Sequence, residues 1–310
     1  MTEPRVVLLG PQYHRPTVGA VLADLGIRGR VATITAGWQE WETEDAALLR
    51  QIGPRALPIR LYARAERIWE SDPELRVAHR AMQDELRILR DLYNQQLDPA
   101  ADAWMALLAA DGPEHLIGPE RAAALEAIQR IDQRHIDRIE AVQAEYRERM
   151  RPGERAAVRA QHAAIAERLA EAEAVVIEGG HAAVLRNRLA LFEVPPLLAD
   201  KTIIGCAAGA MILCRRVVLY NDSPAIGRGH AEVSLPGFGL APGIVALPDA
   251  THRLRLRDGV RMRRLADRIA PDACALLDPG ARLDWDGDQW TGSAERIAPD
   301  GSPAAWESAA

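Results

Sequence analysis

The sequence predicts an α/β fold: a three-layer sandwich in which a mostly parallel sheet carries helices on both faces, interrupted by a large all-helical insertion. The first observation is that short apolar runs, typical of buried strands, alternate with segments of helix length. Strands that alternate with helices at this spacing pair in parallel. The second observation is that strand signals almost vanish between residues 63 and 173. The apolar runs lie at residues 5–10, 30–36, 56–62, 174–178 and 202–204.

Local signals explain the boundaries of the first helices. A helix is expected over residues 17–25, with Thr17 as its N-cap and Gly26 directly after its last turn. A second helix is expected over residues 44–52 and ends before Gly53-Pro54, a pair that breaks helices.

The insertion, placed at residues 63–163, is predicted to be helical throughout. In its longest helix the apolar side chains keep one face, and Arg and Glu fill the other. Such a stripe indicates burial but does not identify the partner, so two interpretations stand. The segment is either a helical hairpin packed on the main domain, or an arm for dimerisation or partner binding. The helices are expected at residues 75–97, 100–110, 119–150 and 154–172.

Beyond the insertion the alternation resumes, so the α/β domain is expected to be discontinuous, over residues 1–62 and 164–295. Asp286-Gly287 lies between alternating residues, which is typical of a β-hairpin. Residues 296–310 are expected to form a loose C-terminal tail. The other expected elements are helices at 182–192 and 257–270, strands at 217–220 and 243–247, and the hairpin at 281–292.

Composition excludes several classes of protein. The chain has 310 residues, of which 48% are hydrophobic and 26% charged, which is ordinary for a globular protein. Its formal net charge of −6 disfavours general binding of nucleic acid, because phosphate contacts need a basic face. No apolar run is long enough for a membrane span, and the first residues lack the pattern of a signal peptide.

The cysteines and histidines predict neither a disulfide framework nor a metal site. Cys206, Cys214 and Cys274 are the only cysteines and show no Cys-x-x-Cys spacing. The histidines form no pair with the spacing of metal ligands. A reducing cytoplasm therefore fits the sequence better than an oxidising compartment. No cofactor is expected.

Residues 203–214 carry the most informative motif. A strand ends in Gly-x-x-x-Gly and passes at once into a helix, which is the pattern of a nucleophile elbow. In such a turn, small residues allow the central side chain to rise above the sheet at the start of a helix. The central position here is Ala207, which has no nucleophilic atom. Taken alone, the motif is also compatible with an ordinary glycine-rich joint between a strand and a helix.

Three further motifs accompany the elbow: a strand that ends in Gly179-Gly180, the sequence Asn-Asp-Ser-Pro at 221–224, and Gly-Phe-Gly-Leu-Ala-Pro-Gly at 237–243. Together they resemble the peptidase E and cyanophycinase family of serine hydrolases, which have a class I glutamine amidotransferase-like fold. The family elbow reads Gly-x-Ser-Ala-Gly-Ala, and residues 205–210 match it everywhere except at the serine. The resemblance is loose over residues 5–62 and good over residues 164–290.

The resemblance implies a Ser-His-Asp triad, and two of its three positions are occupied by other residues. The nucleophile position holds Ala207, and the family histidine falls at Asp249, so only Asp222 remains. The triad mechanism needs an attacking oxygen, an imidazole to take its proton and a carboxylate to orient that imidazole. Covalent acyl transfer by the family mechanism is therefore not expected.

A rewired site is the alternative, and three side chains could provide it. Cys206 precedes the elbow centre, but neighbouring side chains at a strand end point to opposite sides, which predicts that it faces the core. His252 lies three residues beyond Asp249 and is otherwise a surface loop histidine. His181 follows the Gly-Gly pair near the expected oxyanion pocket and is otherwise a simple helix-start residue.

The pocket is expected to include Gly179, Gly180, His181, Gly205 and Ala208. Trp38 is added because it follows the second strand, at the end where ligands bind in parallel sheets. Trp38 and its neighbour Trp41 could equally form a hydrophobic plug.

The leading functional hypothesis is a catalytically degenerate relative of these hydrolases that acts in binding or assembly. Its ligand would be a small peptide or amino-acid-like molecule, and its partner a second copy or another protein bound through the insertion. The alternative is a hydrolase or transferase acting on amide or aspartyl-type peptide bonds through Cys206, His181 or His252. A third hypothesis is non-covalent acid–base chemistry by Asp222 or Asp249.

Overall fold

A seven-stranded sheet forms the centre of the molecule in the computed structural model, which describes residues 5–222 and 230–306. Five of its strands are mutually parallel, and β10 and β11 extend one edge as an antiparallel hairpin. The strand order is β11 (Trp290–Gly292), β10 (Arg282–Trp285), β1 (Val6–Leu9), β5 (Thr202–Cys206), β4 (Ala172–Ile177), β2 (Arg30–Ile34) and β3 (Ala56–Pro58).

Both faces of this sheet are covered, which explains why its strands are continuous apolar runs rather than alternating ones. Along β4, Ala174 and Val176 join the apolar layer under α1 (Val18–Asp24) and α2 (Ala46–Ile52). Val175 and Ile177 face the opposite layer, which contains side chains of α7 (Ala182–Leu191) and α8 (Ala208–Leu213). The predicted three-layer α/β architecture is confirmed.

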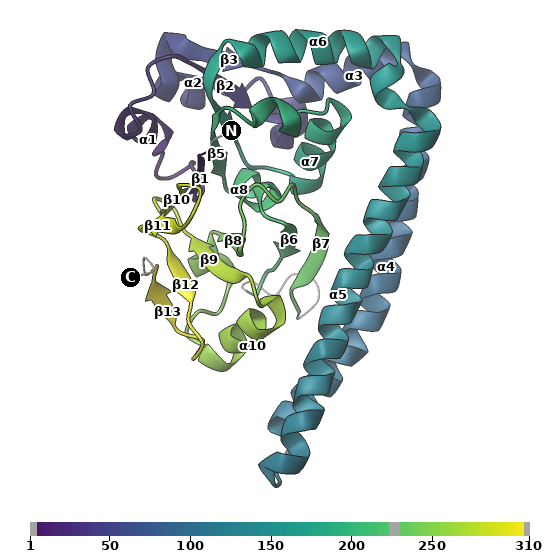
Figure 1. The fold of residues 1–310 in the computed structure, drawn as a ribbon, viewed down its shortest axis with the longest axis vertical. Coiled ribbons are helices and arrows are strands. Elements are labelled where there is room, and N and C mark those ends of the chain that lie inside the picture. Colours follow the sequence, from purple (N-terminus) through teal and green to yellow (C-terminus); the bar gives the residue numbers. More distant parts are fainter. Residues whose placement is uncertain (1–4, 223–229, 307–310) are drawn as a thin grey trace.

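A second, smaller sheet lies below the first (Figure 1). Within it β8 and β9 are parallel, and α10 (Gly259–Ile269) packs against β9 and β12. The short helix α9 (Ala250–Arg253) follows β8 directly. The strand order is β13 (Pro303–Ala305), β12 (Glu295–Ile297), β9 (Ala273–Leu277) and β8 (Ile244–Pro248), and a separate ribbon pairs β6 (Arg216–Leu219) with β7 (Glu232–Pro236).

The large helical segment is confirmed, and most of it is one long hairpin. Two helices of 37 residues each, α4 (Pro73–Ala109) and α5 (Glu114–Met150), run antiparallel along one side of the molecule, and their tip projects beyond the sheets (Figure 1). α3 (Leu61–Ser71) enters the hairpin and α6 (Ala156–Ala170) leaves it. Short 3-10 helices lie at η1 (Ala36–Trp41), η2 (Gly53–Arg55), η3 (Pro152–Glu154) and η4 (Pro195–Leu198).

The structure corrects the predicted helix break near residue 98. Pro99 lies inside the continuous helix α4, although a proline removes one backbone hydrogen bond from a helix interior. Leu97, Ala101 and Trp104 are buried against Ile128 of α5 on either side of the proline. This packing holds the helix together across the proline, which sequence reasoning treated as a boundary.

The expected loose C-terminal tail also differs from the structure. Residues 303–305 form β13, which pairs antiparallel with β12. The strands β7, β9 and β12 were not predicted either. No helix among residues 5–222 and 230–306 is both long and apolar enough to cross a membrane.

A buried polar cluster fixes the helical hairpin on the body. The Arg268 guanidinium of α10 donates to both carboxylate oxygens of Asp132 on α5, at 2.7 Å each. The Tyr93 hydroxyl of α4 donates to Asp132 at 2.7 Å and accepts from Arg268 Nη2 at 2.9 Å and from the Val233 amide of β7 at 3.0 Å. All three side chains are buried, so four elements meet at one desolvated ion pair.

Replacing Asp132 with Ala should lower the free energy of unfolding by about 3–5 kcal/mol, because Arg268 would keep a buried charge without a counterion. Urea unfolding followed by circular dichroism measures this. Asp137→Ala is the matched control, since Asp137 is exposed on the same helix, and we expect a change within about 0.5 kcal/mol. Equal stability of the two variants would contradict the role assigned to the cluster.

Candidate functional site

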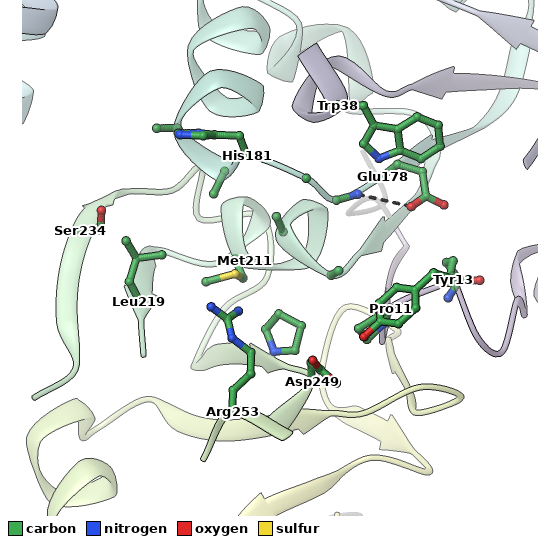
Figure 2. Close-up of a pocket in the computed structure, with 18 of the residues that line it drawn as sticks. Pro11, Tyr13, Trp38, Glu178, His181, Met211, Leu219, Ser234, Asp249 and Arg253 are labelled. Carbon is green, nitrogen blue, oxygen red and sulfur yellow. Dashed lines mark hydrogen bonds between the residues drawn. The ribbon is translucent and has the colours of Figure 1, made fainter. Parts of the chain in front are cut away.

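A cavity of about 740 Å³ lies where the parallel strands β1, β4 and β5 end. Ligands bind at this edge in parallel α/β sheets because loops and helix starts converge there. Trp38, Glu178 and Tyr13 lie on one side of the cavity, and Leu219 and Ser234 lie on the other (Figure 2). Other lining residues are Gly179, Gly180, His181, Ala207, Ala208, Met211, Arg90, Asp249 and Arg253.

The turn after β5 has the geometry of a nucleophile elbow. Ala207 has φ 48° and ψ −115°, a backbone conformation that non-glycine residues seldom adopt. Its amide donates to the Leu9 carbonyl of β1 at 2.9 Å, and its carbonyl accepts from the Met211 amide at 3.1 Å. Ala207 therefore lines the cavity from a strained turn whose tip has only a methyl group.

Close packing explains the glycines of the motif. A Cβ at Gly209 would lie 2.0 Å from the carbonyl oxygen of Ile177 in β4, which no side chain can accommodate. A Cβ at Gly205 would lie 3.0 Å from the backbone of Ala210 and 2.6 Å from Leu213 Cδ1. Gly205 is buried in the joint, whereas Ala208 lines the cavity.

The Gly179-Gly180 loop closes one side of the elbow. A Cβ at Gly179 would lie 3.0 Å from Ala207 Cβ, and Gly180 has φ +96°. His181 follows, with its amide bonded to the Gly37 carbonyl at 2.7 Å. Its Nδ1 accepts from the Val184 amide at 3.3 Å and so caps α7, which leaves the ring proton on Nε2. The capping contact therefore occupies Nδ1 of this imidazole.

Asp249, at the family histidine position, lies in the cavity wall. It has a left-handed backbone conformation with φ 59° and directly follows β8. Its Oδ1 lies 2.8 Å from Nδ1 of His252, whose side chain is 69% exposed and is not part of the cavity wall. Burial, together with the charge and hydrogen bond of Asp249, raises the pKa of Tyr13. The structure thus places a carboxylate and a phenol in the cavity wall on this side of the elbow, with the His252 imidazole bonded to that carboxylate outside the wall.

Asp222 lies apart from the elbow cavity. Its carboxylate accepts from Arg261 Nη2 at 2.6 Å and Nε at 2.8 Å, and its amide donates to the Arg253 carbonyl at 2.6 Å. It lines a separate cavity of about 70 Å³ beside Trp104 and His230. Ser223 and Pro224 of the same motif lie outside the described residues. Asp222 is therefore held in an ion pair, and within the described residues no imidazole bonds to its carboxylate.

Cys206 faces the core, as the alternation of side chains predicts. It is completely buried in the apolar layer under α1 and α2. Burial and the nearby Glu178 carboxyl raise the pKa of its thiol well above the usual range. A thiol in this position stays protonated and is a poor nucleophile.

Glu178 is the residue that sequence reasoning missed. It directly follows β4 in the cavity wall, is 6% exposed, and accepts from the Gly179 amide at 3.3 Å. Burial raises the pKa of its carboxyl to about 7, although the hydrogen bonds from Gly179 and Cys206 oppose the shift. The sequence contains a signal for this residue: a glutamate stands between the apolar run Ala-Val-Val-Ile and two glycines.

The two tryptophans after β2 have different surroundings. Trp38 lines the cavity, whereas Trp41 is 59% exposed and is not part of the wall. Arg90 of α4 also lines the cavity, so the helical hairpin contributes to this site. Within the described parts of the chain, no group of three or more His, Cys, Asp or Glu side chains is placed to hold a metal ion.

Comparison with known proteins relates the second half of the chain to a hydrolase family. Residues 150–289 match the model of peptidase family S51. The resemblance to the peptidase E family is confirmed for this S51-like region, which contains the elbow and Asp249. A second model, described as the DNA-binding N-terminal part of a plasmid replication region, matches residues 8–135.

Two solved structures are similar to the chain. A peptidase from an acI-B1 Actinobacterium has 12% identity and a TM-score of 0.45, with 97% of this chain and 92% of that chain covered. A putative peptidase E from Listeria monocytogenes EGD-e has 15% identity and a TM-score of 0.31, with 44% of this chain and 65% of that chain covered. No curated protein matches the chain.

Replacing Ala207 with Gly should raise the free energy of unfolding by about 1 kcal/mol, because glycine adopts a positive φ without steric cost. The matched control is Ala208→Gly, one residue later inside α8, which should lower it by about 0.5 kcal/mol or more. Urea unfolding measures both. A destabilised Ala207→Gly variant would show that the turn is not strained.

Replacing Glu178 with Gln should stabilise the protein in a pH-dependent way. Because the folded state raises this pKa to about 7, the folded protein loses stability as pH rises from the ordinary value of 4.5 towards 7. The gain from the neutral variant should therefore be small at pH 4.5 and reach about 3 kcal/mol above pH 7. Exposed Glu167→Gln is the control, and a pH-independent difference at Glu178 would contradict the assignment.

Proposed function

We propose that this chain is a catalytically degenerate relative of the peptidase E and cyanophycinase hydrolases, which uses the elbow cavity to bind a ligand. The observation that carries the proposal is Ala207. The turn keeps the backbone of a nucleophile elbow, at φ 48° and ψ −115°, while its tip carries only a methyl group. No attacking oxygen or sulfur is available at the position where the covalent bond would form.

The surrounding groups support the loss of triad chemistry. Asp249 replaces the imidazole in the cavity wall, His181 uses Nδ1 to cap α7, and Asp222 pairs with Arg261. A nucleophile, a base and an orienting acid must form one hydrogen-bonded chain for this mechanism. Here each candidate has another partner or faces another way.

The ligand is best described as small, amino-acid-like or peptide-like. Arg90 and Arg253 line the cavity, and within residues 5–222 and 230–306 neither forms an ion pair with a carboxylate. They can hold a carboxylate of the ligand, while Trp38 and Met211 offer apolar contact. The Arg253 guanidinium lies over the Tyr220 ring at 5.0 Å, which limits its movement.

The helical hairpin supports the assembly part of the proposal. Val77 and Ile88 of α4 are 67% and 59% exposed, and such apolar side chains favour contact with a second copy or a protein partner. We propose no nucleic acid as partner: residues 73–150 contain ten arginines and fifteen acidic residues, a net charge of −5. Three free, buried cysteines fit a reducing compartment such as the cytoplasm.

A second candidate function is non-covalent acid–base catalysis on an amide or aspartyl-type bond. Glu178 favours it, because a carboxyl with a pKa of about 7 in a cavity wall can donate and accept a proton near neutral pH. Turnover that is lost in Glu178→Gln and kept in Cys206→Ala would select this candidate. The thiol alternative requires instead a stoichiometric adduct with iodoacetamide that disappears in Cys206→Ala.

Replacing Ala207 with Ser alone should not restore hydrolysis of an aspartyl dipeptide, because Asp249 stands where the family mechanism needs an imidazole to take the proton of the hydroxyl. Dipeptide turnover and labelling by a fluorophosphonate measure this. The double variant Ala207→Ser/Asp249→His should label faster than the single one, since it adds an imidazole at the family position. Turnover by the single variant would contradict both the assignment of Asp249 and the proposed degeneracy.

A further inference from the structure

A second cavity, of about 340 Å³, lies between the base of the helical hairpin and α7, outside the elbow site. Its wall combines apolar side chains with arginines. Met82 comes from α4, Tyr146 and Arg147 come from α5, and Arg186 and Leu191 come from α7. The elbow cavity shares none of these residues, so the second cavity is a separate site in the fold.

Arg186 is a buried cation in this wall. Only 9% of the residue is exposed, its Nη1 donates to Gln143 Oε1 at 2.7 Å, and its Nε donates to the Pro236 carbonyl at 3.2 Å. The guanidinium also lies 5.5 Å from the centre of the Phe238 ring. All of these partners are uncharged, and no carboxylate in the described parts of the chain forms an ion pair with it. A charge removed from water without a counterion is unfavourable.

Arg147 adds a second positive charge to the same cavity. Burial, and next the charge of Arg147, lower the pKa of Arg186 to about 10, while exposed Glu140 opposes this. The wall also contains Glu154 and Glu193. Glu154 faces Arg151 at 3.6 Å, and in the described parts of the chain neither glutamate forms an ion pair with Arg147 or Arg186. Two guanidinium groups that repel each other thus border one cavity.

We propose that this cavity binds a small organic anion, a carboxylate or a phosphate ester with an apolar body, through Arg147 and Arg186. An anion between the two guanidinium groups supplies the missing countercharge and relieves their repulsion. Met82, Ala190 and Leu191 form the apolar part of the wall, which suits a hydrocarbon body better than inorganic phosphate alone. The hairpin and α7 both contribute, so the bound anion would link the two.

Isothermal titration of the full-length protein at low salt tests this with four probes: phenyl phosphate, benzoate, inorganic phosphate and phenol. We expect phenyl phosphate or benzoate to bind, and the stronger of the two identifies the acidic group. Inorganic phosphate and neutral phenol should each bind at least about tenfold more weakly, because phosphate lacks the apolar body and phenol lacks the negative charge. No binding of either organic anion at millimolar concentration would overturn the proposal.

Variants then locate the site. Arg147→Ala should weaken binding at least about tenfold, because it removes one charge-assisted contact. Arg149→Ala is the matched control on the same helix, where Arg149 is exposed and pairs with Glu145 at 3.5 Å, and it should change affinity less than twofold. Arg186→Lys keeps the charge and should retain part of the affinity. Binding that survives Arg147→Ala but is lost in Arg253→Ala would place the anion in the elbow cavity and overturn the proposal.

Discussion

The close contact between the turn after β5 and the end of β4 is the constraint on which the candidate site depends. The backbone at Gly209 approaches the Ile177 carbonyl so closely that any side chain there would lie 2.0 Å from the oxygen. This contact, with the Ala207 amide bound to Leu9, forces residue 207 into its positive φ and leads its side chain to the cavity. The elbow is therefore a property of packing between parallel strands, and it persists without a nucleophile.

That persistence has a physical explanation. A strained backbone conformation persists where the packing around a residue outweighs that residue's own conformational preference. Gly205 and Gly209 fill a joint with no room for Cβ atoms, so the turn is fixed whether its tip bears a hydroxyl or a methyl group. A turn that carries only a methyl group at Ala207 can thus still line a formed cavity, which is the basis for proposing a ligand-binding role for this site.

The helical hairpin contributes residues to both the elbow cavity and the second cavity. Its position depends on the buried Asp132–Arg268 pair, with Tyr93 linking α4 to β7 through Val233. From this position α4 places Arg90 in the elbow cavity, and the base of the hairpin encloses the second cavity beside Arg186. A segment that seems separate in the sequence therefore completes one site and forms most of another.

The sequence by itself determined the alternating elements, the parallel sheet, the elbow at Ala207 and the helical character of residues 63–163, because these depend on local periodicity and on glycine spacing. It also indicated that Cys206 faces the core, since side chains alternate along a strand. Tertiary structure alone decided that α4 continues through Pro99, that residues 303–305 pair as β13, and that Asp222 meets Arg261 instead of the elbow. It alone placed Glu178 in a desolvated wall and brought Arg90 of α4 to the same cavity. Burial, ion pairing and long-range strand pairing depend on which distant segments meet, and a local pattern in the chain does not contain that information.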